Sequence, residues 1–187
     1  MKIYRVEVDV GMYQTFYRSN TNEWSLDQCI FDGRSRLADW TPPEIYIMHP
    51  KLERGNFFGF AATIGTWIVD AQGVELMDRF WSCELLPLEH KAEKFFVVNV
   101  LEVINVLDEN RTQFRIGKTT GARIGIERHE FHKDRLTEAP LFKIPETCRA
   151  EVLTCEGFLE PEDEFKFNLE QSGLKGLVFH EIWNDDK

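Results

Sequence analysis

The chain has 187 residues, 43% of them hydrophobic and 13% aromatic, so it can form one large domain or two small ones and is not disordered. Its 32 acidic residues exceed its 22 lysines and arginines and give a net charge of −10, which argues against nucleic-acid binding and suits a basic protein partner. None of its four cysteines belongs to a Cys-x-x-Cys pair, so we expect no metal and no cofactor.

The N-terminal half is expected to contain several strands and one short helix. Residues 2–10 alternate apolar and charged side chains, which predicts a half-buried strand. A signal peptide would need an unbroken apolar stretch there, so we expect a cytoplasmic protein with free thiols. The apolar residues 57–69 are too few to span a bilayer, so no membrane association is expected. Further strands are predicted at 44–48, at 67–69 and, as an edge strand because of Pro87, at 84–88. An amphipathic helix is predicted over 71–81, with Val74, Met77 and Trp81 on its core face.

The C-terminal half begins with a buried strand over residues 94–100, followed by a helical turn over 101–108. Near the end, Pro161 is expected to open a helix whose first turn is acidic, and Gly173 to stop it in a left-handed conformation. The other strands of this half are predicted at 112–116, 123–131, 139–144, 150–155 and 177–183.

These elements predict an α+β fold, mainly antiparallel or mixed sheet with a few short helices, and a C-terminal helix followed by a final strand. The alternation of strands and helices typical of nucleotide-binding folds is absent from this pattern. We expect a single domain over residues 1–187, and a two-lobed organisation divided near residue 90 is compatible with the sequence.

Two segments carry weak signals of chemistry. His129 and His132 could share a helix face and bind a metal, but the alternation at 123–126 predicts a strand, where this spacing sends them to opposite faces. Residues 117–121 read Gly-Lys-Thr-Thr-Gly, yet Thr112 stands where a phosphate loop needs glycine, so a hairpin turn is expected. No catalytic residues are therefore assigned, and the protein is not expected to be an enzyme.

Four segments in order give the chain a resemblance to the Imm11 (DUF1629) family of bacterial immunity proteins. They are Phe31-Asp32-Gly33-Arg34-Ser35 with Asp39-Trp40-Thr41-Pro42-Pro43, then Glu84-Leu85-Leu86-Pro87-Leu88, then Phe96-Val97-Val98-Asn99-Val100 with Val106-Leu107-Asp108, and finally Gly173-Leu174-Lys175-Gly176-Leu177-Val178-Phe179. The segments look structural: a turn, a core anchor, strands and a helix stop.

The resemblance implies an immunity protein that neutralises the toxin domain of a polymorphic toxin system by stoichiometric occlusion. The partner would be a cognate toxin domain, and the acidic composition favours a basic one. Trp24, in a polar segment, is the aromatic residue that we expect to be exposed. The acidic residues that could face a cationic partner are Glu160, Glu162, Asp163, Glu164, Asp185 and Asp186, although helix-start and tail acids also have a structural explanation.

Two other functions stay open from the sequence. One is a metal-dependent or other small-molecule enzyme that uses the region of His129 and His132. The other is an adaptor protein of a secretion-associated operon.

Overall fold

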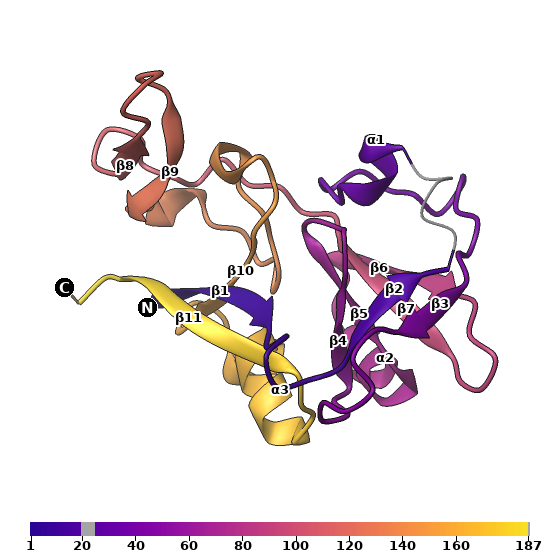
Figure 1. Ribbon diagram of the computed structural model, residues 1–187. Helices are drawn as coiled ribbons and strands as arrows, with labels where there is room; N and C mark the ends of the chain where they lie inside the picture. The colour runs from indigo at the N-terminus through magenta and orange to yellow at the C-terminus, as the bar shows by residue number, and fades with distance from the viewer. Residues whose placement is uncertain (20–24, 187) are drawn as a thin grey trace.

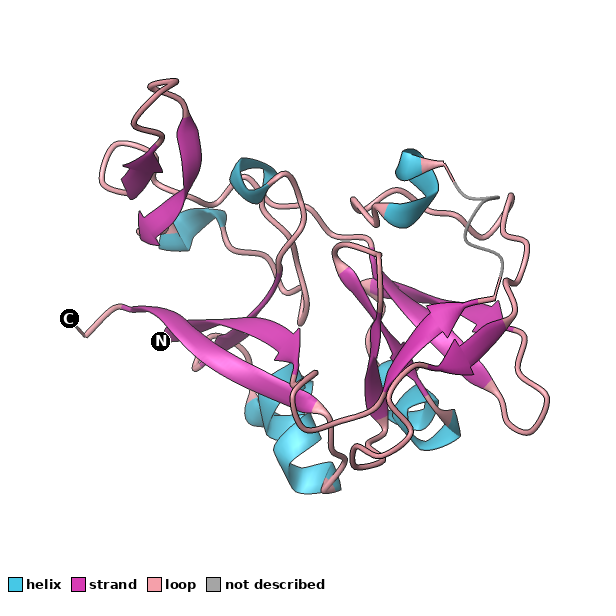
Figure 2. Ribbon diagram, in the orientation of Figure 1, coloured by secondary structure: helices cyan, strands magenta, loops and turns pink. Residues whose placement is uncertain are grey.

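The computed structural model describes residues 1–19 and 25–186, and this part of the chain forms eleven strands and three short α-helices (Figure 1, Figure 2). The predicted α+β class, with a C-terminal helix followed by a final strand, is confirmed. Within these residues, no helix has the length and apolar character needed to cross a bilayer.

Six strands form a sheet in the order β3-β2-β4-β5-β7-β6, which puts β6 at one end, as Pro87 predicts. The sheet curls until its end strands meet: Ile45 N–H donates to the Glu89 carbonyl over 2.9 Å, and Glu89 N–H donates to the Pro43 carbonyl over 3.0 Å. All six strands supply apolar side chains to one buried cluster, so the sheet is a small barrel with a phenylalanine-rich interior. The strands are β2 (Thr15–Arg18), β3 (Ile45–Ile47), β4 (Phe57–Phe60), β5 (Thr66–Val69), β6 (Cys83–Leu88) and β7 (Phe95–Val100).

A second sheet has the antiparallel order β10-β1-β11 and joins the two ends of the chain. Figure 1 shows α3 on one side of this sheet and the hairpin of β8 and β9 on the other. The turn of that hairpin is Gly117–Gly121, as predicted. The elements are β1 (Lys2–Val8), β8 (Gln113–Ile116), β9 (Arg123–Arg128), β10 (Val152–Glu156), α3 (Phe165–Ser172) and β11 (Leu177–Asn184).

The two sheets share one core. A single buried cluster contains Val6 from β1, Trp67 from β5, Leu76 from α2 (Ala71–Met77) and Phe165 from α3. A division near residue 90 would separate β6 from β7, which pair along their whole lengths. The sheets are therefore not an N-terminal and a C-terminal lobe.

Several local predictions were wrong. Residues 101–108 are extended rather than helical, because Val103 and Leu107 form bridges to Lys143 and Phe131. Residues 139–144 form only isolated bridges and no strand. The helix predicted over 71–81 stops at Met77, and the terminal helix begins at Phe165 after a separate 3-10 turn at Pro161–Asp163. β2, β4 and the short α1 (Leu26–Cys29) were not predicted.

Three of the four family-like segments meet at one side chain, Glu84 on β6. Its carboxylate accepts hydrogen bonds from the Ser35 hydroxyl (2.8 Å), the Arg36 N–H (2.7 Å) and the Asn99 amide (2.7 Å). Beside it, the Trp40 indole donates to the Pro87 carbonyl over 2.7 Å. The Asn99 amide also donates to the Arg34 carbonyl over 2.9 Å, so residues up to 65 positions apart are tied into one polar junction on the barrel.

The fourth segment, which joins α3 to β11, links the second sheet to the barrel. The Lys175 carbonyl accepts the N–H groups of Asn56 (2.8 Å) and Phe57 (3.0 Å), where β4 begins. Gly173 ends α3 in the left-handed region at φ 69°, as predicted. Gly176 lies at φ 123°, immediately before β11.

Candidate functional site

The predicted contact residues fall into four groups. Glu160, Glu162 and Asp163 are exposed on or beside the 3-10 turn, and Asp186 is exposed near the C-terminus. Asp185 is engaged: it pairs with the N-terminal ammonium over 2.7 Å and with Lys133, and these cations lower its pKa to about 2. Trp24 lies outside the described residues.

Glu164 is buried, so it is not available to a partner at the surface. Its carboxylate accepts three backbone N–H groups, from Gly157 (2.6 Å), Phe158 (3.0 Å) and Leu159 (3.2 Å). The acidic character of this residue serves the loop before α3, since a carboxylate that accepts several amides fixes their conformation.

Glu160, Glu162 and Asp163 line a groove of about 480 Å³ between the turn after α2 and the loop after β10. Trp81 lies at this groove and is 66% exposed, although the sequence placed it on the buried face of a helix. We call this feature the acidic groove and define it by the residues Trp81, Glu138, Pro140, Glu160, Glu162 and Asp163.

The backbone around Trp81 is fixed on both sides. Phe80 is buried and meets the Phe165 ring edge-on at 5.5 Å between centroids. Ser82 is also buried, and its carbonyl accepts the N–H of Leu101 over 2.8 Å. Because Phe80 turns inward immediately before β6 begins, its neighbour Trp81 is directed outward.

The acidic wall of the groove is fixed by α3. The Asn168 amide donates to the carbonyls of Glu162 and Glu164, each over 2.8 Å. With the three amides held by Glu164, these bonds fix the loop that carries Glu160 and Asp163. Both walls are therefore preorganised, which lowers the entropy cost of binding.

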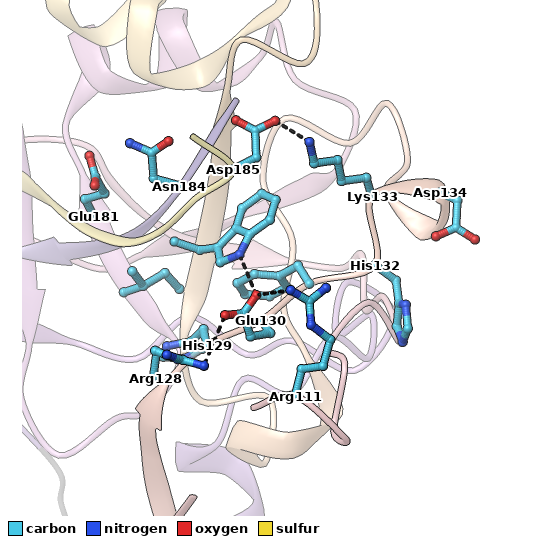
Figure 3. Close-up of a pocket in the computed structure, with 13 residues that line it drawn as sticks. Arg111, Arg128, His129, Glu130, His132, Lys133, Asp134, Glu181, Asn184 and Asp185 are labelled. Carbon is cyan, nitrogen blue, oxygen red and sulfur yellow. Dashed lines mark hydrogen bonds and ion pairs between the residues drawn. The ribbon is translucent and has the colours of Figure 1, made fainter. Parts of the chain in front are cut away.

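A second hollow, of about 660 Å³, lies between the end of β11 and residues 128–134 (Figure 3). Glu130 is at its centre: the Trp183 indole donates to it over 3.3 Å, and the guanidinium groups of Arg111 and Arg128 each lie 3.6 Å away. Opposite charges thus neutralise one another inside this hollow.

His129 and His132 both line the second hollow but have different surroundings. His129 is buried and stacks on Phe131, with centroids 5.8 Å apart, and burial followed by the charge of Arg5 lowers its pKa to about 4. His132 is half-buried, with its Nε2 3.9 Å from Asp108. Within residues 1–19 and 25–186, no three His, Cys, Asp or Glu side chains are arranged to hold a metal ion.

Sequence reasoning missed Trp81 and Glu138 as members of the groove. Trp81 follows Val74 and Met77 at helical spacing, but i→i−3 bonds at Arg79 and Phe80 end the helical path before it. Glu138 comes from a loop whose position depends on tertiary contacts. The adjacent pair Phe80-Trp81 was the one local sign that Trp81 could be exposed, because neighbouring side chains in extended backbone point to opposite sides.

In comparisons with known proteins, no family model matches the chain, and no curated protein matches it.

Proposed function

We propose that this protein is an immunity protein that binds a cognate bacterial toxin domain stoichiometrically and blocks it without turnover. It would act in the cytoplasm, where a toxin that enters the cell finds its target. The resemblance to the Imm11 family is the source of this proposal.

The observation that carries it is the junction at Glu84. Glu84 and Asn99 face each other in the register of β6 and β7, so their contact follows from strand pairing. The turn that begins at Phe31 is joined to the same carboxylate through Ser35 and Arg36, so three of the family-like segments share one set of hydrogen bonds. This mutual dependence is what a structural signature of a family requires, and it supports the resemblance.

The test is neutralisation by the intact protein. The candidate partner is the product of the neighbouring open reading frame, expressed with and without this chain. We expect growth arrest by the neighbour alone, rescue on co-expression, and a 1:1 complex in size-exclusion chromatography. A neighbour that is harmless alone, or that neither binds nor is rescued, would exclude the immunity function.

A second candidate function is an enzyme of the second hollow, because this hollow holds both predicted histidines and a carboxylate. Metal analysis of the purified protein and the double variant His129→Ala, His132→Ala test this alternative. If the protein carries no metal and the variant still protects cells fully, the histidines have no role in the activity.

A further inference from the structure

The acidic groove has the features of a contact surface. Among the described residues, Trp81 has the largest exposed fraction of the large apolar side chains, at 66%. Tryptophan is highly buried on average in folded proteins and is enriched among the residues that dominate binding energy at interfaces. An exposed tryptophan on a rigid backbone offers a large contact area at a small cost in conformational entropy.

The charge around Trp81 selects the chemistry of its partner. Glu138, Glu160, Glu162 and Asp163 all line the groove, and in the described part of the chain none of their carboxylates forms an ion pair. Arg79 is the one cationic residue among those that line the groove. The potential beside the indole ring is therefore negative and attracts cations.

The exposed face of the Trp81 ring and the carboxylates of the acidic groove together fit a long cationic side chain. A guanidinium or ammonium group over an indole ring gains a cation–π interaction, and tryptophan is the strongest of the aromatic partners. The aliphatic part of an arginine or lysine can cover the apolar surface of Trp81 and Pro140 while its head reaches the carboxylates. The volume of about 480 Å³ is that of a site for side chains rather than for a folded domain.

We propose that the acidic groove binds a basic, extended segment of a partner protein, with an arginine or lysine side chain on the Trp81 ring and its head among Glu160, Glu162 and Asp163. The proposal rests on the proposed function in taking the partner to be a protein. Of the predicted contact residues the groove contains Glu160, Glu162 and Asp163, and it adds Trp81 and Glu138 to them.

The direct test uses an Arg₉ peptide as the probe and the full chain labelled with ¹⁵N. The indole N–H resonance of Trp81 is assigned by its loss in Trp81→Phe. We expect this resonance to shift and saturate as the peptide is added, while the resonance of buried Trp67 stays in place. The apparent affinity should fall at least tenfold in the variant Glu160→Gln, Glu162→Gln, Asp163→Asn.

The matched control removes the same charge elsewhere, with Glu53→Gln, Glu89→Gln and Glu127→Gln, three exposed glutamates that do not line the groove. This variant should bind the peptide within twofold of the original chain. A Trp81 resonance that does not move, or a control variant that loses as much affinity as the groove variant, would overturn the proposal.

A second experiment uses the toxin domain and separates this proposal from the proposed function. Trp81→Ala should weaken the complex at least tenfold, whereas Phe167→Ala, which removes another exposed aromatic, should leave its affinity unchanged. Tight binding that survives Trp81→Ala and the triple groove variant would refute the groove and leave the immunity function intact. Failure of the unmodified chain to bind any toxin would refute the immunity function, and the peptide titration still decides the groove.

Discussion

At the scale of single residues, Gly176 determines how closely the loop between α3 and β11 approaches the barrel. A Cβ atom at this position would lie 2.1 Å from the Phe57 carbonyl oxygen, and the φ of 123° is one that side chains rarely tolerate. Gly173 also has a positive φ, but a Cβ there would meet nothing within 4 Å. Position 176 therefore needs glycine for both space and conformation, whereas position 173 needs it for conformation alone.

We expect Gly176→Ala to lower the free energy of unfolding by about 3 kcal/mol or more, because backbone atoms must move to admit the methyl group. Gly173→Ala should cost about 1 kcal/mol, the price of a left-handed alanine without a clash. Urea denaturation of the two variants measures the difference. Equal losses would mean that the approach to Phe57 is unimportant.

Lys143 gives a prediction about pH. Its side chain is fully buried and donates to the carbonyls of Phe31 and Gly65, and burial lowers its pKa from 10.5 to about 7 despite the carboxylate of Asp32. Between about pH 7 and 10, the unfolded chain holds a proton that the folded chain has released, so this residue makes stability rise with pH.

The variant Lys143→Met lacks this titration. The stability of the original chain relative to the variant should therefore increase by up to about 1.4 kcal/mol per pH unit between pH 7 and 10. Denaturation curves of both proteins at several pH values provide the measurement. Parallel pH profiles would show that the buried amine keeps its ordinary pKa.

At this scale the sequence predicted positions governed by local geometry and missed those governed by packing. Gly173 was identified because a helix stop has a local pattern. Glu164 was taken for a surface acid because its three amide partners precede it in a loop whose path the sequence does not reveal. Trp81 was assigned to the core because the end of α2 depends on where β6 begins.

At the scale of elements, the loop before α3 depends on Glu164. The substitution Glu164→Ala shortens the side chain to a methyl group and leaves three amides without their acceptor. It should therefore destabilise the protein by about 2–3 kcal/mol. Glu162→Ala, on the exposed face of the same turn, should change stability by less than about 0.5 kcal/mol. Thermal unfolding of the pair compares them, and similar effects would contradict the role of Glu164.

Strands with clear alternation or β-branched residues were predictable, and those without were not. Residues 2–8 and 95–100 match their predicted ranges closely. Residues 57–60 were missed because phenylalanine and glycine carry no period-two pattern when both faces are buried. Residues 101–108 were misassigned because their bridges to Lys143 and Phe131 are distant in sequence.

At the scale of the whole molecule, the shared core predicts one cooperative unfolding transition. Apolar residues of the barrel, of the second sheet and of both longer helices belong to one cluster, so unfolding of either sheet exposes apolar surface of the other, although the barrel interior is a cluster of its own. Calorimetric and van't Hoff enthalpies should agree, and near- and far-ultraviolet circular dichroism should give the same midpoint. Two separate transitions would indicate independent domains. The sequence could not reveal this shared core, because it depends on β1 joining the C-terminal strands.

The meeting of Ile45 and Glu89 has a consequence for behaviour at high concentration. Since the end strands of the barrel bond to each other, their edges offer little template for intermolecular strand addition, the usual first step toward fibrous deposits. The long edge belongs instead to β11, where His180 and Glu181 are exposed and a bulge interrupts the register with β1. The polar side chains and the bulge of that strand disfavour intermolecular strand addition there as well.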